Sequence, residues 1–254
     1  MIVALDAGNS RIKWAIHDGA SWREHGNLPT EDAARLPEVA RRWVGAGDLV
    51  ACCVAGPVVE AAIEAAAAAS GRRLRWLRSA ASAHGIRNGY EPPERLGSDR
   101  WAAMIGARAK TQDACLVVCA GTATTVDWLD AAGNFRGGLI LPGVRLMCAA
   151  LARNTAQLPD AEGEYRKEPR NTMDAIVSGC LHAQAGAIER MFARVTGEGA
   201  ALCLLTGGAA YRIAPCLEIP YRMEEMLVLD GLLGSGNRGQ RTEDSNICGR
   251  KGAR

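Results

Sequence analysis

The chain begins with two short apolar runs, at residues 2–6 and 11–17, separated by Gly8-Asn9-Ser10. We expect two strands joined by a tight turn, because Gly and Asn tolerate the backbone angles that such a turn needs. The rest of the first half is expected to contain a helix over 30–45 with Thr30 as N-cap, a strand over 48–54, a helix from Pro57 to Ser70 closed by Gly71, a strand over 74–77, a loop over 80–98 and a helix over 99–110.

The second half repeats this alternation of apolar strands and helical segments. The expected elements are strands over 114–120, 124–129, 137–143, 201–206 and 226–230, helices over 144–153 and 172–196, and a helix opened by Gly207-Gly208. Strands that alternate with helices predict an α/β fold. The polar stretch 235–254, with five basic and two acidic residues, is predicted to be a disordered tail.

A faint internal repeat relates the two halves. At a constant offset, Asp6, Ala7 and Gly8 fall on Cys119, Ala120 and Gly121, and Asn9 falls on Thr122. Each copy reads strand, Ala-Gly, small polar turn, strand, which predicts a duplicated domain facing itself across a cleft. The expected lobes are residues 1–112 and 113–234.

Composition narrows the class of protein. Apolar residues make up 48% of the 254 residues, enough for a sizeable core, and a net charge of +2 gives no reason to expect a nucleic acid or acidic membrane as partner. No apolar run approaches the ~20 residues that span a bilayer. Nine cysteines without C-x-x-C spacing, and no basic leader before the first strand, predict reduced thiols and a cytoplasmic location.

The first candidate site is the turn between Asp6 and Lys13. A phosphate-binding turn needs inward backbone N–H groups, small residues and a nearby positive charge. Gly8, Asn9 and Ser10 meet the first two needs, and Lys13 is the candidate charge. Asp6 at a strand end is costly unless it binds something, and a hydrated Mg²⁺ fits. The alternative is an ordinary hairpin turn.

The second candidate site, Gly121-Thr122-Ala123-Thr124-Thr125, is a similar turn after a strand. β propensity alone also explains its threonines, and only the pairing with the first hairpin favours phosphate binding. The sequence has no Walker loop, and no Rossmann fingerprint follows the first strand.

The third candidate site is Gly97-Ser98-Asp99-Arg100, at a junction of loop and helix. Asp99 either caps the helix or serves as the carboxylate that phosphoryl transfer to an alcohol needs to accept the hydroxyl proton. The fork of Arg100 suits a substrate carboxylate.

In this order the three stretches read D-x-G-N-S-x-x-K, G-x-D-R and G-T-A-T-T. Together they resemble the signature of type III pantothenate kinases, in the acetate and sugar kinase/Hsp70/actin superfamily. Residues 137–143 (GGLILPG), Asn171-Thr172 and Thr206-Gly207-Gly208 add to the resemblance, which spans 2–234.

The resemblance implies phosphorylation of pantothenate by MgATP, the first step toward coenzyme A, by a homodimer of chains with two ribonuclease-H-like lobes. It implies an ATP site made of Asp6, Ala7, Gly8, Asn9, Ser10, Arg11, Ile12, Lys13 and Thr122. It implies a pantothenate site made of Tyr90, Gly97, Ser98, Asp99, Arg100 and Thr172. In these roles Asp99 is the general base and Asp6 organises Mg²⁺.

One position departs from the family pattern. The family writes its second turn D-x-G-T-A, with an aspartate that binds potassium or ammonium, and here that position is Cys119. A neutral thiol is a poor ligand for a hard cation, and Asp127 lies at a later strand position. The sequence therefore predicts activity with little dependence on a monovalent cation, unless Asp127 or backbone carbonyls hold it.

Two alternatives stay open on the sequence alone. One is a kinase of the same superfamily for another small hydroxylated metabolite, against which the short chain and the G-x-D-R motif argue. The other is a catalytically silent regulator, against which the retained Asp6, Lys13 and Asp99 argue. Fold alone does not establish the substrate.

Overall fold

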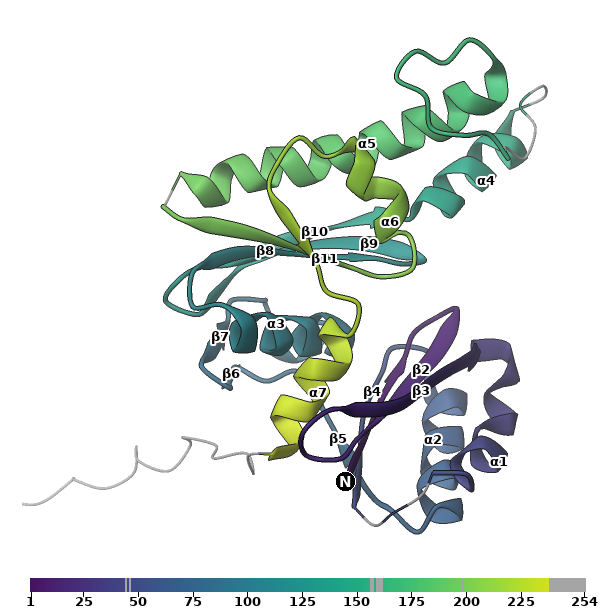
Figure 1. Cartoon of the computed structure of the whole chain (residues 1–254), viewed down its shortest axis with the longest axis vertical. Coiled ribbons are helices and arrows are strands. Elements are labelled where there is room, and N and C mark those ends of the chain that lie inside the picture. Colours follow the sequence, from purple (N-terminus) through teal and green to yellow (C-terminus); the bar gives the residue numbers. More distant parts are fainter. Residues whose placement is uncertain (44, 46, 156–157, 159–161, 198, 238–254) are drawn as a thin grey trace, which may run out of the picture.

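The computed structural model describes residues 1–43, 45, 47–155, 158, 162–197 and 199–237, and shows two sheets with helices packed around them (Figure 1). The first sheet has the strand order β3-β2-β1-β4-β5. Its strands are β1 (Ile2–Ala7), β2 (Arg11–His17), β3 (Trp22–Pro29), β4 (Asp48–Cys53) and β5 (Arg73–Trp76).

The second sheet has the order β12-β11-β8-β9-β10-β7-β6. Its strands are β6 (Ser82–Ala83), β7 (Ile86–Asn88), β8 (Ala114–Ala120), β9 (Ala123–Leu129), β10 (Asn134–Pro142), β11 (Ala201–Thr206) and β12 (Tyr221–Met223). Five of these strands, β10-β9-β8-β11-β12, repeat the order and directions of the first sheet, which agrees with the internal repeat in the sequence.

The repeat is not perfect at the turns. In the first hairpin Ala7 pairs with Ile12, whereas in the second Ala120 pairs with Thr124, so the second turn is one residue shorter. As a result Asp6 faces Lys13 across the first hairpin, whereas its counterpart Cys119 faces Thr125.

Helices cover the sheets in three groups (Figure 1). One group, on the first sheet, is a 3-10 helix (Thr30–Arg35), α1 (Leu36–Ala40) and α2 (Pro57–Ala69). A second group, on the outer face of the second sheet, is α4 (Val144–Asn154), α5 (Thr172–Thr196) and α6 (Ala210–Ile213). The third group is α3 (Ser98–Lys110) and α7 (Leu227–Asn237), which lie between the sheets and bury apolar side chains against both.

The helices α3 and α7 touch backbone to backbone at two glycines. A Cβ on Gly106 would lie 2.2 Å from the Leu227 carbonyl oxygen, and a Cβ on Gly231 would lie 1.8 Å from that of Ala102. Only glycine permits this approach, which brings both helices into one central core between the lobes.

Several predicted elements are corrected by the structure. The expected strand over 226–230 is instead a turn residue, 226, followed by the first residues of α7, and the expected helix over 30–45 is a 3-10 turn followed by five helical residues. Thr30 is not an N-cap, because its hydroxyl donates to the Gly8 carbonyl at 2.7 Å. The polar strand β3 was not predicted, and the expected loop over 80–98 contains β6 and β7.

The lobe boundaries stay a prediction, and two features bear on them. The hairpin β6–β7 joins the second sheet although it precedes residue 112, and residues 235–237 of the predicted tail belong to α7, with Ser235 buried. Residues 238–254 lie outside the described residues. None of the helices in the described part of the chain is long and apolar enough to span a membrane.

Candidate active site

The two hairpin turns of the repeat meet across the cleft between the sheets. The hydroxyls of Ser10 and Thr122 are 2.6 Å apart, although the residues are 112 positions apart in the chain. The first turn is closed by a hydrogen bond from the Gly8 amide to the Arg11 carbonyl (3.1 Å). The Thr30 hydroxyl donates a second hydrogen bond to the Gly8 carbonyl. The structure thus brings together the two turns that the sequence paired.

These turns border a cavity of about 660 Å³. Of the predicted site residues, its lining includes Asp6, Gly8, Asn9, Ser10, Arg11, Lys13, Asp99, Cys119 and Thr122. The predicted residues outside this lining are Ala7, Ile12, Tyr90, Gly97, Ser98, Arg100 and Thr172. Ala7 and Ile12 have no exposed surface and pack in the core of the first lobe, so neither residue contacts the cavity.

Asp6 lies at the end of β1, with Lys13 opposite on β2 and Cys52 opposite on β4. The Cys52 thiol donates to its carboxylate, with 3.5 Å between Sγ and Oδ1. Burial and the nearby Asp99 carboxylate raise the pKa of Asp6 to about 6, against the opposing effects of Lys13 and Cys52. A site that raises the pKa of a carboxylate in this way gains from a cation that compensates both negative charges.

Asp99 occupies the first turn of α3, where its Oδ1 accepts a bond from the Arg100 amide at 2.8 Å. Burial raises its pKa, partly offset by that bond and by the Arg100 charge. A half-buried carboxylate with a raised pKa is a better proton acceptor than a solvated one. The neighbouring Ser98 does not reach the cavity, because its hydroxyl donates to the Cys53 carbonyl at 3.2 Å.

The side chain of Arg100 is not part of the cavity lining; it is nearly buried between α3 and the strands β9 and β10. Its Nε lies 3.2 and 3.0 Å from the two carboxylate oxygens of Asp127, and its Nη2 also donates to Asp127. The rings of Tyr90 and Phe135 stack on each other and lie 5.6 and 5.8 Å from the guanidinium carbon. Part of the fork that the sequence assigned to a substrate is therefore held by Asp127.

Cys119 is the next-to-last residue of β8 and lies near Asp99 and Asp127. Burial, together with the Asp127 and Asp99 carboxylates, raises the pKa of its thiol far above the ordinary value, so the thiol is protonated at neutral pH. Both oxygens of Asp127 contact Arg100 and the residue has no exposed surface. In the described residues no group of three or more His, Cys, Asp or Glu side chains is arranged to hold a metal ion.

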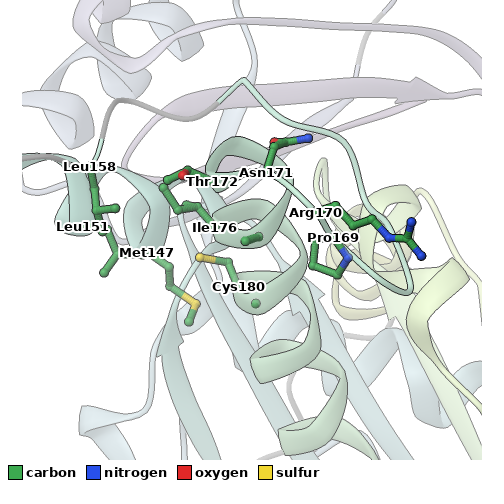
Figure 2. A pocket seen from close by; sticks show the side chains of 11 residues that line it. Met147, Leu151, Leu158, Pro169, Arg170, Asn171, Thr172, Ile176 and Cys180 are labelled. Carbon is green, nitrogen blue, oxygen red and sulfur yellow. The ribbon is translucent and has the colours of Figure 1, made fainter.

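Thr172 lies elsewhere, at the start of α5. It lines a second cavity of about 780 Å³ between α4 and α5, and Figure 2 shows it with Leu158, Ile176 and Cys180, which also line this cavity. This cavity shares no lining residue with the cavity that contains Asp99. Within one chain, Thr172 and the other predicted substrate residues are not brought together.

Sequence reasoning missed several residues of the site. Cys52 contacts Asp6 only because β4 pairs in parallel with β1, a register that no local pattern reveals. Val228 and Leu229 line the cavity from α7, which was predicted as a strand. Asp127 did carry a signal, because a carboxylate inside an apolar strand requires a buried partner.

Solved structures resemble this fold at low sequence identity. A Campylobacter jejuni protein titled a conserved putative Baf family transcriptional activator superposes with a TM-score of 0.57 and 18% identity, over 91% of this chain and 95% of that one. A putative 2-dehydro-3-deoxygalactonokinase from Sinorhizobium meliloti gives a TM-score of 0.57 and 13% identity, over 92% and 97%. The fold is that of the actin-like ATPases and sugar kinases, as predicted.

Sequence relatives narrow this class to one family. A family model described as type III pantothenate kinase matches residues 2–194, and the chain belongs to this family. A protein of that name from Aromatoleum aromaticum is 52% identical over 232 residues, which cover 91% of this chain and 96% of the relative. Another, from Azoarcus sp., is 48% identical and covers 91% and 89%. The predicted pantothenate kinase activity is confirmed at the level of the family.

Proposed function

We propose that this chain transfers the γ-phosphoryl group of MgATP to the primary hydroxyl of pantothenate, with the cavity between the two hairpin turns as its active site. The observation that carries this proposal is that both turns and Asp99 border one cavity, although they come from three distant parts of the sequence. The identity of the substrate is inferred from the family, and the role of each residue is inferred from the geometry of the site.

The phosphate groups are bound by the two turns. Gly8, Asn9 and Ser10 offer backbone N–H groups without bulky side chains, and Thr122 faces them from the second lobe. Lys13 is half-buried opposite Asp6 in the first hairpin and supplies positive charge to the cavity lining. The direct bond between Ser10 and Thr122 is exchanged for bonds to phosphate oxygens when the nucleotide enters.

Asp6 would hold Mg²⁺, which when bound would neutralise part of the phosphate charge. The pair of carboxylates with raised pKa, Asp6 and Asp99, fits this assignment, because a divalent cation compensates the charges that now disfavour ionisation. One protein carboxylate with phosphates and waters is a common arrangement for this ion.

Asp99 takes the proton of the substrate hydroxyl as that oxygen bonds to phosphorus, while the bond from phosphorus to the β–γ bridging oxygen of ATP breaks. The proton ends on the Asp99 carboxylate, and ADP leaves with the electron pair of the broken bond. Burial raises the Asp99 pKa toward the range in which a carboxylate is an effective base. Arg100, the next residue, binds the carboxylate of pantothenate.

The reaction depends little on potassium or ammonium. Cys119 is a protonated thiol, which neither needs a compensating cation nor binds one well. Asp127, the other candidate ligand, has both oxygens committed to Arg100.

The enzyme acts as a homodimer. Thr172, which the family resemblance assigns to the substrate, is exposed and faces a cavity away from Asp99 in its own chain, so a second copy is needed to bring it to the substrate. The exposed apolar side chains of Leu139, Ile140, Leu146 and Leu151 lie on β10 and α4 in the same lobe.

One assay tests the function. The purified chain with MgATP should release ADP with pantothenate and much less with sugars or short carboxylic acids, and mass spectrometry should find a monophosphate ester of pantothenate. The Asp99→Asn variant is the control for contaminating kinases. ADP release with a sugar instead of pantothenate would favour another kinase of the superfamily, and no release with any acceptor would favour a regulator.

A further inference from the structure

Asp127, the buried partner of Arg100, has no role of its own in the phosphoryl transfer. Asp127 comes from β9 and is fully buried, and the side chain of Arg100 from α3 is 6% exposed. The small surface that the pair shows to solvent therefore belongs to the arginine. Removing one partner of such a buried pair leaves an uncompensated charge, so these positions are tightly coupled.

The contacts use one particular edge of the guanidinium. Asp127 accepts from Nε and Nη2, which form the side-on edge, and Nη1 takes no part in the pair. Arginine has five N–H donors in a rigid plane, so a carboxylate on the side-on edge fixes the direction of the end-on edge. The rings of Tyr90 and Phe135 limit rotation of this plane.

Gly138 on β10 closes the pocket from the other side. A Cβ at this position would lie 2.1 Å from Oδ1 of Asp127 and 2.9 Å from Nη2 of Arg100. The strand therefore passes directly over the pair. A Cβ at 138 would also lie 2.6 Å from the Val126 carbonyl oxygen, so a side chain there would displace the pair or the neighbouring strand. Three elements (α3, β9 and β10) thus cooperate to hold one guanidinium.

We propose that Asp127 is a positioning residue, which holds Arg100 by its side-on edge so that the end-on edge binds the carboxylate of pantothenate next to Asp99. Asp127 does not touch the substrate; it acts through Arg100, and Gly138 provides the space for the pair. This inference rests on the proposed function, because the substrate carboxylate is the group that the end-on edge receives.

The test compares pantothenate with pantothenol, in which a hydroxyl replaces the carboxylate. The unmodified enzyme should prefer pantothenate in kcat/KM. In Asp127→Asn this preference should fall at least tenfold, mainly through KM for pantothenate, while KM for ATP changes less than twofold. Gly138→Ala keeps both charges but crowds the pair, and should reduce the preference in the same direction.

A matched control separates positioning from a general loss of structure. Asp130 is also a buried carboxylate on the β9 side, but it accepts from Asn134 and has no contact with Arg100, so Asp130→Asn should leave the preference unchanged. If Asp127→Asn does not fold, Gly138→Ala decides. If the folded variants keep a preference for pantothenate over pantothenol within threefold of that of the unmodified enzyme, this inference is wrong and the proposed function still stands. If the unmodified enzyme does not turn over pantothenate, the proposed function is wrong.

Discussion

The substitution Asp6→Asn should abolish efficient use of MgATP and yet make the ligand-free protein more stable. In the folded state burial and Asp99 raise the pKa of Asp6 from 3.8 to about 6. The folded state thus binds this proton more tightly than the unfolded state between about pH 4 and 6, and stability falls as pH rises through that window. Above pH 6 the Asp6 carboxylate is ionised in both states, and the free energy of unfolding is lower by the full amount that corresponds to the pKa shift.

The size of the effect follows from the shift. About two pKa units correspond to roughly 3 kcal/mol, and the part of Asp6 that faces the cavity is solvated, so this value is an upper limit. An asparagine never ionises, so at pH 8 the variant should be about 1.5–3 kcal/mol more stable, which is ~5–10 °C in Tm for a chain of this size. At pH 4.5 the gain should shrink to about 1 kcal/mol or less.

Urea unfolding of both proteins without nucleotide or divalent cation, at pH 4.5 and pH 8, measures this difference. The control is Asp48→Asn, because hydrogen bonds from Arg73 and Arg75 lower the pKa of Asp48, and its loss should destabilise the protein at pH 8. MgATP should then stabilise the unmodified enzyme more than Asp6→Asn. Equal stability at pH 8, or a gain independent of pH, would refute the reasoning.

Two further predictions concern the reaction. Asp99→Asn should lower kcat by roughly 10²–10⁴-fold with nucleotide binding unchanged in calorimetry; normal turnover with weakened ATP binding would assign Asp99 another role. The rate of the unmodified enzyme should rise less than tenfold when potassium is added at constant ionic strength, because Cys119 is uncharged. The Cys119→Asp variant adds a carboxylate beside Asp99 and Asp127, so its reaction should be slow in sodium and partly restored by potassium. Strong potassium activation of the unmodified enzyme would contradict this account.

The fold could be predicted from sequence where local patterns matched the final environment. The hairpin at residues 2–17 and the buried strands carried clear apolar runs, and the repeat indicated two similar lobes. The prediction of a strand over 226–230 was wrong, because a short apolar run fits a strand or a buried helix equally well. Its helix is stabilised by contact with α3 at Gly231, a residue that intrinsic propensity disfavours in helices.

The candidate site could be predicted as motifs but not as contacts. Asp6, Lys13, Asp99 and Thr122 stood in recognisable stretches and do border one cavity. Register, packing and assembly decide the rest. For example, the partner of Arg100 is a residue 27 positions away on another element, and the place of Thr172 at α5 separates it from Asp99.

The position of α7 has a consequence for synthesis on the ribosome. Leu227 and Leu232 complete the same core as Ala4 and Val50, which are among the earliest residues to be made. Translation proceeds from the N-terminus, so this apolar surface of the first sheet stays uncovered until residues 227–232 have been made. Until α7 docks, the nascent first sheet therefore exposes apolar surface that is prone to aggregation.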